Sequence, residues 1–354
     1  MTRRARSCSV GAVIRGFGII GAGIIAAVHA DAIALLPDAR LLAVTDVAAG
    51  AAQAFAAARG CAAEPSLDDL LARHDVDVVC VCVPSGQHAQ VGIRAAKAGK
   101  HLVIEKPVDV TLEAADRLLA AAREAGVALT VVSQHRFDPG VIALKRLIDD
   151  GALGTLVLGE ASTKWYRTQE YYDSAPWRGT WEFDGGALMN QASHYVDLVD
   201  WLIGPVESVQ AYTATLARNI QVEDSGVVAV RWRSGALGSI NVTMLTHSKN
   251  FEGSITILGE KGTVRIGGVA VNEIQKWDFA ESHEDDAKIQ SANYETTSVY
   301  GFGHPLYYDN VIGALRGELE PETDGREGLR SLELLIAAYL SARDGRRVAL
   351  PLEY

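Results

Sequence analysis

Near the N-terminus a short apolar segment runs directly into a glycine-rich turn, and this junction limits the folds open to the chain. The segment Phe17–Ile20 has the composition of a buried strand, and Gly21-Ala-Gly23-Ile-Ile-Ala26 follows it. The alanine-rich stretch Ile24–Leu36 then predicts a helix. A strand, a glycine turn and a helix in this order are typical of a βαβ unit, in which backbone amides at the helix N-terminus face a diphosphate.

A second glycine pattern overlaps the first. Gly16-Phe-Gly18-Ile-Ile-Gly21 matches G-x-G-x-x-G literally, but it lies inside the predicted strand. The glycines of a dinucleotide site must follow the strand and open the helix, so the pattern beginning at Gly21 is preferred. We therefore expect Gly21, Gly23, Ile24 and Ile25 to contact the cofactor, although a flexible glycine-rich turn with no ligand stays open as an alternative.

An acidic residue stands where such a site needs one. Asp46 ends the apolar run Leu41–Thr45 and comes 20 residues after Ala26. A carboxylate at the end of the second strand accepts hydrogen bonds from ribose hydroxyls and repels a 2′-phosphate. The pattern therefore predicts NAD rather than NADP as the cofactor.

The first 160 residues alternate apolar runs with alanine-rich helical stretches, which predicts an α/β domain built on a doubly wound parallel sheet. The predicted strands are Phe17–Ile20, Leu41–Thr45, Val76–Val83, His101–Ile104 and Val127–Val132. The predicted helices are Ile24–Leu36, Ala48–Arg59, Ser66–His74, Gln87–Ala98 and Thr111–Ala125. Near-continuous Val, Ile and Leu runs fit strands that are buried on both faces.

After a linking helix at Pro139–Asp150 the pattern changes to successive strand-like runs, which predicts an α+β domain with a large, mostly antiparallel open sheet. The predicted strands are Thr155–Trp165, Val206–Leu216, Ser225–Trp232, Ala236–Leu245, Ser254–Leu258 and Thr263–Ile266, and the helices are Ala187–Leu202 and Asp324–Asp344. All six Trp and all eleven Tyr lie after residue 164, which supports two domains with different tasks. We expect a disordered extension at 1–12, a nucleotide-binding domain at 13–138 and a substrate-binding and oligomerisation domain at 139–354.

Charge and cysteine content exclude several classes of partner. The 354 residues include 33 basic and 44 acidic side chains, for a formal net charge of −11, which disfavours binding to nucleic acid or to an anionic membrane surface. Cys80 and Cys82 lie in an apolar run and are predicted as core residues, because no second pair completes a zinc site. Four scattered cysteines fit a reducing cytoplasm, and we expect no metal.

Two further strand ends belong to the same edge of the predicted sheet. Val83-Pro84-Ser85 ends one strand and His88 opens the next helix, where a cofactor ribose or nicotinamide would lie. Glu105-Lys106-Pro107 ends the following strand. Ligands of open α/β sheets bind outside the carboxyl ends of the strands, so Lys106 is predicted at the mouth of the active site.

This tripeptide, the glycine turn and the strand-rich second half together resemble the Gfo/Idh/MocA oxidoreductases over nearly the whole chain. The resemblance implies a Rossmann domain and a Lys106 that touches nicotinamide and substrate, often beside a cis peptide bond to the proline. A second family motif, G-G-x-L-x-D-x-x-x-H, corresponds to the segment from Gly185 to His194. The usual aspartate is Asn190, which cannot act as a base, so proton transfer is predicted to fall on His194.

The spacing of polar residues in the predicted helix supports this interpretation. Asn190, His194, Asp197 and Trp201 are separated by four, three and four residues, which is the spacing of one helix face. A polar stripe on an apolar helix needs a cavity or partners. Histidine titrates near neutral pH and can take a hydroxyl proton, but a core histidine bonded to Asp197 stays open as an alternative.

An aromatic segment with interleaved arginines follows the linking helix, from Lys164 to Trp181. Aromatic planes and guanidinium groups together suit a nucleobase, a sugar face and phosphate or carboxylate groups. A sheet edge packed by aromatics is the alternative for any single residue here. The predicted substrate-binding residues are Arg167, Gln169, Tyr172, Trp177, Arg178, Asn190 and His194.

The stretches WYRTQEYY, WRGTW and ALMNQ resemble one subgroup in particular, the UDP-N-acetyl-2-amino-2-deoxyglucuronate (UDP-N-acetylglucosaminuronate) 3-dehydrogenases. The resemblance implies oxidation of the sugar C3 hydroxyl in surface-polysaccharide biosynthesis, with Lys106 and His194 as catalytic residues, by a homodimer or homotetramer. Some relatives also re-oxidise NADH with 2-oxoglutarate. Asp184 departs from the subgroup, in which glycine is expected at this place.

Three other functions stay open at this point. A dehydrogenase of free sugars or polyols, of the inositol or glucose type, would be indifferent to UDP. An NAD-dependent glycosidase would oxidise C3 transiently, release an aglycone and form no net NADH. A non-catalytic NAD-binding regulator on the same scaffold would not need Lys106 and His194, which are both present.

Overall fold

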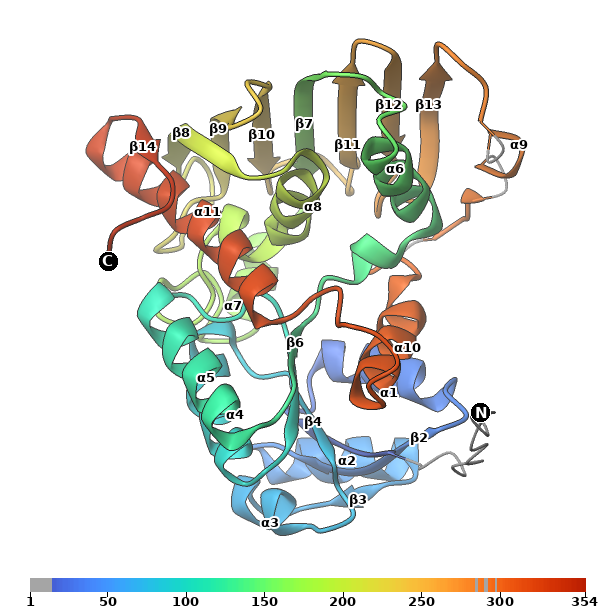
Figure 1. The fold of residues 1–354 in the computed structure, drawn as a ribbon. Helices are drawn as coiled ribbons and strands as arrows, with labels where there is room; N and C mark the ends of the chain where they lie inside the picture. The colour runs from blue at the N-terminus through green and yellow to red at the C-terminus, as the bar shows by residue number, and fades with distance from the viewer. Residues whose placement is uncertain (1–14, 284–285, 290–291, 297) are drawn as a thin grey trace, which may run out of the picture.

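The computed structural model describes residues 15–283, 286–289, 292–296 and 298–354 (Figure 1). The extension predicted at 1–12 and Cys8 within it lie outside the described residues. The predicted boundary between 138 and 139 stays a prediction. In the described part, no helix is both long enough and apolar enough to cross a membrane.

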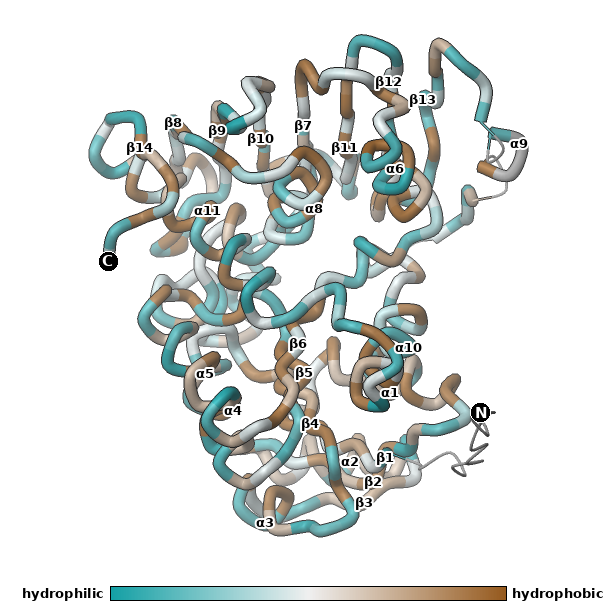
Figure 2. Tube along the Cα trace, viewed as in Figure 1, coloured by the Kyte–Doolittle hydropathy of each residue, from teal (hydrophilic) through white to brown (hydrophobic). Residues whose placement is uncertain are grey.

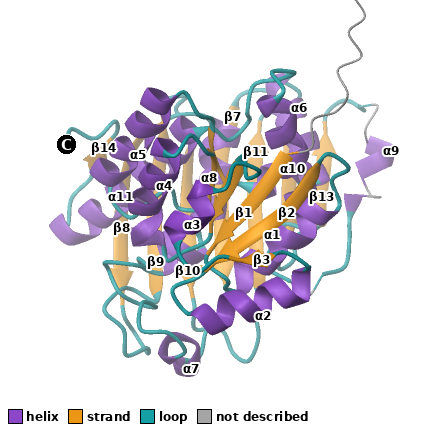
Figure 3. Ribbon diagram, turned by 90° about the horizontal axis from the view of Figure 1, so that it is seen from below, coloured by secondary structure: helices purple, strands orange, loops and turns teal. Residues whose placement is uncertain are grey.

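The first sheet has six strands in the order β3-β2-β1-β4-β5-β6, and every neighbouring pair is parallel. The strands are β1 (Arg15–Ile20), β2 (Ala39–Thr45), β3 (Ala62–Ala63), β4 (Val78–Val81), β5 (His101–Ile104) and β6 (Leu129–Val131). The connecting helices are α1 (Ile24–Ala34), α2 (Ala49–Arg59), α3 (Leu67–Ala72), α4 (His88–Lys97) and α5 (Leu112–Ala125). They flank β1 and β2 on both sides (Figure 3), so the predicted doubly wound sheet is confirmed, with its switch point between β1 and β4.

The second sheet has the order β13-β12-β11-β7-β10-β9-β8-β14, and it is antiparallel except for the pair β7 and β10, as predicted. Its strands are β7 (Leu156–Lys164), β8 (Val206–Ala214), β9 (Ser225–Trp232), β10 (Leu237–Thr243), β11 (Glu252–Gly259), β12 (Gly262–Gly267), β13 (Glu273–Phe279) and β14 (Val348–Ala349). The helices α6 (Pro139–Asp149), α8 (Ser193–Ile203) and α11 (Gly325–Asp344) lie along one face of this sheet (Figure 1).

Shorter elements complete the chain: the 3₁₀ turns η1 (Ser85–Gln87) and η2 (Gln134–Phe137), the π-helical turn η3 (Ala187–Gln191), and the helices α7 (Gln169–Asp173), α9 (Asp286–Ile289) and α10 (Gly303–Leu315). The sequence did not predict β3, β13, β14 or α10. Tyr307 and Tyr308 of α10 are fully buried beside Phe17 of β1, so this late helix packs against the first sheet next to α1 (Figure 1).

The core follows the strands of both sheets. Figure 2 shows hydrophobic residues concentrated along β4 and β5 at the centre of the first sheet and hydrophilic turns at the outer ends of the second. Cys80 and Cys82 are buried in this core as free thiols, as predicted.

The predicted helix Ala187–Leu202 is wrong in its first turn. Residues 187–191 form η3, and the α-helix begins only at Ser193. The backbone amide of Leu188 donates to Glu223 Oε1 (2.8 Å) and that of Met189 to the Tyr339 hydroxyl (3.1 Å). The amide of Ala192 donates to the carbonyl of Ala187 (2.9 Å), five residues earlier, so the segment forms a wider turn than an α-helix.

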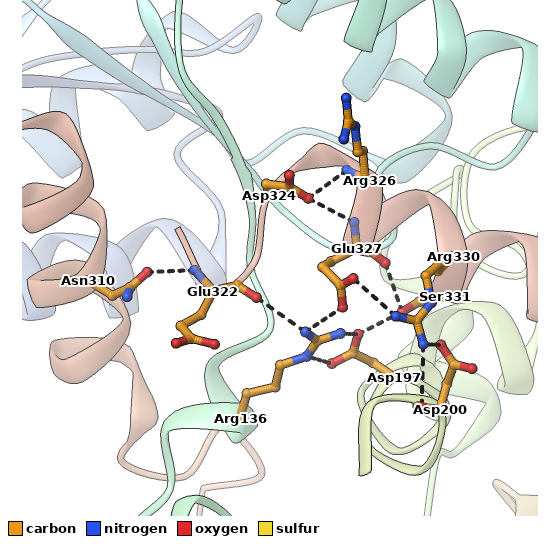
Figure 4. Close-up of polar contacts among 10 residues, drawn as sticks. All are labelled: Arg136, Asp197, Asp200, Asn310, Glu322, Asp324, Arg326, Glu327, Arg330 and Ser331. Atoms are coloured by element: carbon orange, nitrogen blue, oxygen red, sulfur yellow. Dashed lines mark hydrogen bonds and ion pairs between the residues drawn. The ribbon is translucent and has the colours of Figure 1, made fainter. Parts of the chain in front are cut away.

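One arginine connects the two sheets. Arg136 of η2 follows β6 and is buried, and its Nε and Nη2 donate to both carboxylate oxygens of Asp197 on α8 (2.8 and 2.6 Å). Its Nη1 reaches Glu327 of α11 (2.8 Å) and the carbonyl of Glu322 (3.2 Å), as Figure 4 shows. The ring of Trp201 lies 5.1 Å from the guanidinium carbon.

We expect Arg136→Ala to destabilise the fold strongly. Removing one partner of a buried ion pair leaves an uncompensated charge and costs about 3–5 kcal/mol. The free energy of unfolding in urea, followed by tryptophan fluorescence, should fall by that amount. The matched control is Arg326→Ala, beside Glu327 at the start of α11. Arg326 is exposed, so its removal should change the free energy of unfolding by less than about 0.5 kcal/mol. Equal losses in both variants would contradict the role of Arg136.

Candidate active site

A cleft of about 1230 Å³ runs between the carboxyl ends of β1, β2, β4 and β5 and the loops of the second sheet. The predicted site residues that line it are Gly21, Gly23, Ile24, Ile25, Asp46, Val83, Pro84, Ser85, His88, Glu105, Lys106, Arg167, Trp177, Arg178, Asn190 and His194. A cleft outside the carboxyl ends of parallel strands is where open α/β sheets bind ligands.

The glycine turn has the geometry that the second pattern predicts. Gly16 and Gly18 lie within β1, whereas Gly21 follows the strand with a φ of +98°. A Cβ at Gly21 would lie 2.5 Å from the carbonyl oxygen of Cys82, so only glycine fits there. A Cβ on Gly23 would meet no atom within 4 Å, and this open space lies at the N-terminus of α1, where unpaired amides can bind a diphosphate.

Asp46 connects this turn with the end of β2. Its Oδ2 accepts a hydrogen bond from the Ala22 amide and its Oδ1 accepts one from the Ala48 amide, both at 2.7 Å. The carboxylate is half-buried and lines the cleft, and each oxygen keeps a lone pair for a further donor. The position and charge suit a ribose diol.

His88 borders the cleft, and its ring lies between the turns that follow β4 and β5. Its Nδ1 lies 2.7 Å from the carbonyl oxygen of Pro107, and its Nε2 lies 2.9 Å from that of Val83. The ring therefore joins the turn after β4 to the turn after β5. Burial lowers the pKa of His88 and favours the neutral ring, whose single N–H donates to one of these two carbonyl groups, so the ring offers a ligand a contact surface rather than a proton.

The turn after β5 carries two charged side chains. The peptide bond between Lys106 and Pro107 is cis. Glu105 is buried and accepts from His29 Nε2 (2.9 Å) and from the Lys106 amide (3.0 Å). Although burial alone raises the pKa of Glu105, the His29 hydrogen bond and nearby positive charges bring it to about 2.

Lys106 points its ammonium group at the loop before α8. Its Nζ donates to the backbone oxygen of Asn190 (2.7 Å) and to Asn190 Oδ1 (3.2 Å). Burial lowers the pKa of Lys106, while Glu105 and Asp184 act to raise it. An ammonium group has three donors, so one N–H remains for a ligand in the cleft.

His194 lies on the same wall of the cleft, at the start of α8. Its ring packs edge-on against His135 of η2, with centroids 5.2 Å apart. Burial first, and then the positive charge of Lys106, hold the pKa of His194 well below its usual value. The ring is therefore neutral near pH 7 and able to accept a proton. Its proposed alternative partner, Asp197, is instead bound to Arg136, so the core pair of His194 and Asp197 is excluded.

Stacked arginines form a second wall of the cleft. The guanidinium of Arg178 lies 4.3 Å from the Tyr171 ring centroid and 4.5 Å from that of Trp177, and that of Arg167 lies 5.1 Å from Trp165. Stacking fixes each guanidinium. Nη1 of Arg167 donates to the Tyr166 carbonyl (2.9 Å) and Nη1 of Arg178 to the Tyr171 hydroxyl, and the remaining N–H groups can meet an anion.

Two predicted substrate residues do not line the cleft. Gln169 is half-exposed and holds the loop at Asn219, whose amide donates to its Oε1 (2.8 Å). Tyr172 is 6% exposed and belongs to the packing beneath the wall. Both were assigned because they belong to the aromatic segment, but α7 turns their side chains away from the cleft.

The sequence analysis missed several lining residues, which are Gln134, Trp165, Tyr166, Tyr171, Gln191, Tyr300 and His304. Trp165 and Tyr171 lie in the aromatic segment already singled out. His304 comes from α10, which the sequence did not predict. Its ligand atoms lie close to those of His29 and Glu105, within 4.8 Å, and the predicted absence of a metal stays a prediction.

Comparison with known proteins gives a consistent result. Residues 15–133 match the model of an oxidoreductase family, NAD-binding Rossmann fold, and residues 145–350 match that family's C-terminal alpha/beta domain. The chain is 58% identical to the WlbA dehydrogenase from Bordetella pertussis in complex with NADH and UDP-GlcNAcA, over 96% of this chain and 99% of that one, with a TM-score of 0.93.

Two further relatives extend the comparison. The WlbA dehydrogenase from Chromobacterium violaceum, also in complex with NADH and UDP-GlcNAcA, is 56% identical over 98% of both chains, with a TM-score of 0.91. An inositol 2-dehydrogenase of Rhizobium meliloti is 28% identical over 94% of this chain and 98% of its own length.

Proposed function

Because the chain belongs to the Gfo/Idh/MocA oxidoreductase family, we propose that it is an NAD-dependent dehydrogenase that oxidises the C3 hydroxyl of UDP-N-acetylglucosaminuronate. The observation that carries the proposal is its extensive identity with two WlbA dehydrogenases bound to NADH and this nucleotide sugar. The C3 position and a role in surface-polysaccharide biosynthesis rest on the subgroup resemblance of the aromatic segment.

The residues of the first domain fit NAD. The Gly21–Gly23 turn and the amides at the start of α1 would hold the diphosphate, and Asp46 would hold the adenosine ribose and repel a 2′-phosphate. The walls at Val83–Ser85 and His88 would border the nicotinamide half. Bound there, NAD supplies the acceptor for the hydride from the sugar carbon.

Lys106 and His194 have different roles at the reacting hydroxyl group. The neutral ring of His194 accepts the hydroxyl proton, while the free N–H of Lys106 donates to the same oxygen and stabilises the negative charge that develops on it. Burial of both groups excludes water and strengthens these interactions.

The second wall suits a substrate with several negative charges. Arg167 and Arg178 present fixed guanidinium edges, and the planes of Trp165, Tyr171 and Trp177 suit a base or a sugar face. A diphosphate and a uronate carboxylate match these arginines. A free polyol, as in an inositol dehydrogenase, has no charge to place there.

The function is tested with purified protein, NAD and UDP-N-acetylglucosaminuronate, with and without 2-oxoglutarate. We expect the nucleotide sugar to lose two hydrogens in the mass spectrum as nicotinamide absorbance rises, or as 2-oxoglutarate is consumed. Lys106→Met should abolish the change. An unchanged sugar mass with bound NAD would overturn the proposal, and turnover of free polyols or release of an aglycone from glycosides would identify the alternative.

We expect His194→Ala to lower kcat by about 10²–10⁴-fold, the usual contribution of general acid–base catalysis. NAD affinity, measured by titration calorimetry, should stay unchanged, because His194 lies on the substrate side of the cleft. The matched control is His74→Ala, since His74 is exposed and does not line the cleft. Near-normal turnover of His194→Ala would remove this residue from the mechanism.

We also propose that the protein is a homodimer or homotetramer assembled through the second sheet. The helices α6, α8 and α11 cover one face of this sheet (Figure 1). The other face carries Tyr212, Val227 and Leu237, which are 75%, 52% and 49% exposed. Tyr212 and Val227 are cross-strand neighbours, so part of this face is a continuous apolar surface that a second copy would cover.

Light scattering coupled to size exclusion tests the assembly. The wild type should elute with two or four times the chain mass, and Val227→Glu should shift it toward the monomer by burying a charge at the interface. Leu35→Glu, an equally apolar exposed position at the end of α1, should leave the assembly unchanged. A monomeric wild type would contradict the proposal.

A further inference from the structure

Asp184, which departs from the resembling subgroup, lies directly behind the catalytic residues without lining the cleft. Its side chain is 3% exposed. One carboxylate oxygen, Oδ2, accepts from the backbone amide of Gly179 (2.6 Å), and the other accepts from Nδ2 of Asn190. The opposite end of the same amide, Asn190 Oδ1, accepts from Lys106 Nζ (3.2 Å). A continuous chain of hydrogen bonds therefore joins Asp184 to Lys106.

We propose that Asp184 is a positioning residue that fixes the orientation of the Asn190 amide, so that its oxygen always faces the ammonium group of Lys106. A carboxylate only accepts hydrogen bonds and an ammonium group only donates them, while an amide has one end of each kind. The order carboxylate, amide, ammonium admits one orientation of the amide. This proposal deepens the proposed dehydrogenase function, on which its kinetic test rests.

The arrangement also sets how Lys106 is held. An aspartate at position 190, the residue of the family motif, would place a carboxylate oxygen where Asn190 Oδ1 accepts from Lys106. Here the negative charge lies one side chain further away, and Lys106 contacts a neutral oxygen. The ammonium group is therefore supported by a negative charge that it does not contact directly.

Other charged groups face the same two residues. Glu105 and Asp184 favour the charged form of Lys106, whereas Arg167 disfavours it, and the Lys106 charge in turn acts on His194. Around Asp184, burial raises its pKa to about 6, and Arg178 and Lys106 oppose that rise. Burial, and to a smaller extent the Asp184 charge, raises the pKa of Glu223 and of Tyr172.

The single variant Asp184→Asn cannot keep all the hydrogen bonds that join Gly179, position 184, Asn190 and Lys106. If the new amide accepts from the Gly179 amide, its NH₂ group faces Asn190, which must then turn its own NH₂ group toward the Lys106 ammonium. If the new amide is flipped, its NH₂ group meets the Gly179 N–H instead. Either way two donors face each other. Asn190→Asp fails for the converse reason, because it puts two carboxylates in contact.

The double variant Asp184→Asn/Asn190→Asp restores every bond. The new amide at position 184 would accept from Gly179 with its oxygen and donate with its NH₂ group to the new carboxylate at position 190, which would accept from Lys106. We expect kcat/KM to fall about 10- to 100-fold in each single variant and to recover most of that loss in the double variant. The control is Asp173→Asn, which changes an exposed carboxylate of α7 and should leave kcat/KM unchanged.

The pH dependence supplies a readout that a purely structural role would not move. Activity needs protonated Lys106 and is lost as pH rises through its pKa. Removing the Asp184 charge lowers that pKa further, so the alkaline limb of kcat/KM in Asp184→Asn should move to lower pH by about one unit. In the double variant the carboxylate contacts Lys106, and the limb should return to the wild-type pH or lie above it.

A substrate-free measurement separates this proposal from the proposed function. The rate at which acetic anhydride modifies Lys106, followed by peptide mass spectrometry across pH, reports the titration of Lys106 whatever the substrate is. We expect the same order of midpoints, with Asp184→Asn below the wild type and the double variant at or above it. An unchanged Lys106 midpoint in Asp184→Asn, or a double variant no better than the singles, would overturn the role of Asp184.

Discussion

The buried ion pair between Arg136 and Asp197 holds the two halves of the cleft against each other. Arg136 stands in the first turn after the last strand of the parallel sheet, and Asp197 lies in the helix that carries His194. His135, the neighbour of Arg136, packs against the His194 ring. A short segment therefore fixes both the helix α8 and the ring of His194 relative to Lys106. A buried pair of this kind contributes less to net stability than to specifying one arrangement, because desolvation offsets much of its attraction.

Burial then sets the protonation states that this geometry needs. Desolvation lowers the pKa of both His194 and Lys106, since each is charged when protonated. The two residues nevertheless differ in their surroundings. Lys106 has Glu105 beside it and Asp184 behind it, which favour its cationic form, whereas His194 faces the positive charge of Lys106. The same desolvated cleft thus favours the neutral form of His194, while two nearby carboxylates support the charged form of Lys106.

The parts that the sequence predicted are those governed by local rules. Parallel strands buried on both faces give continuous apolar runs, and the glycine turn needs a residue without a Cβ at Gly21. Lys106 could be placed because it follows such a strand. The start of α8 was not predicted, because residues 187–191 have the composition of a helix and their i to i−5 hydrogen bond leaves no mark in the periodicity, while their first amides bond to the distant side chains of Glu223 and Tyr339. Periodicity likewise joined Asp197 to His194 on one face, although the partner of Asp197 comes from a different segment of the chain.

The aromatic segment marks the limit of such reasoning. Its composition indicated an anion-binding wall, and Arg167, Trp177 and Arg178 do line the cleft. Composition alone could not separate them from Gln169 and Tyr172, because that choice depends on how α7 turns. Asp184 shows the converse case, since the sequence marked it only as a departure from a pattern. Its place becomes meaningful through Asn190: where the residue contacting the lysine is an amide, the amide has two possible orientations, and a buried acceptor behind it is the simplest way to select one.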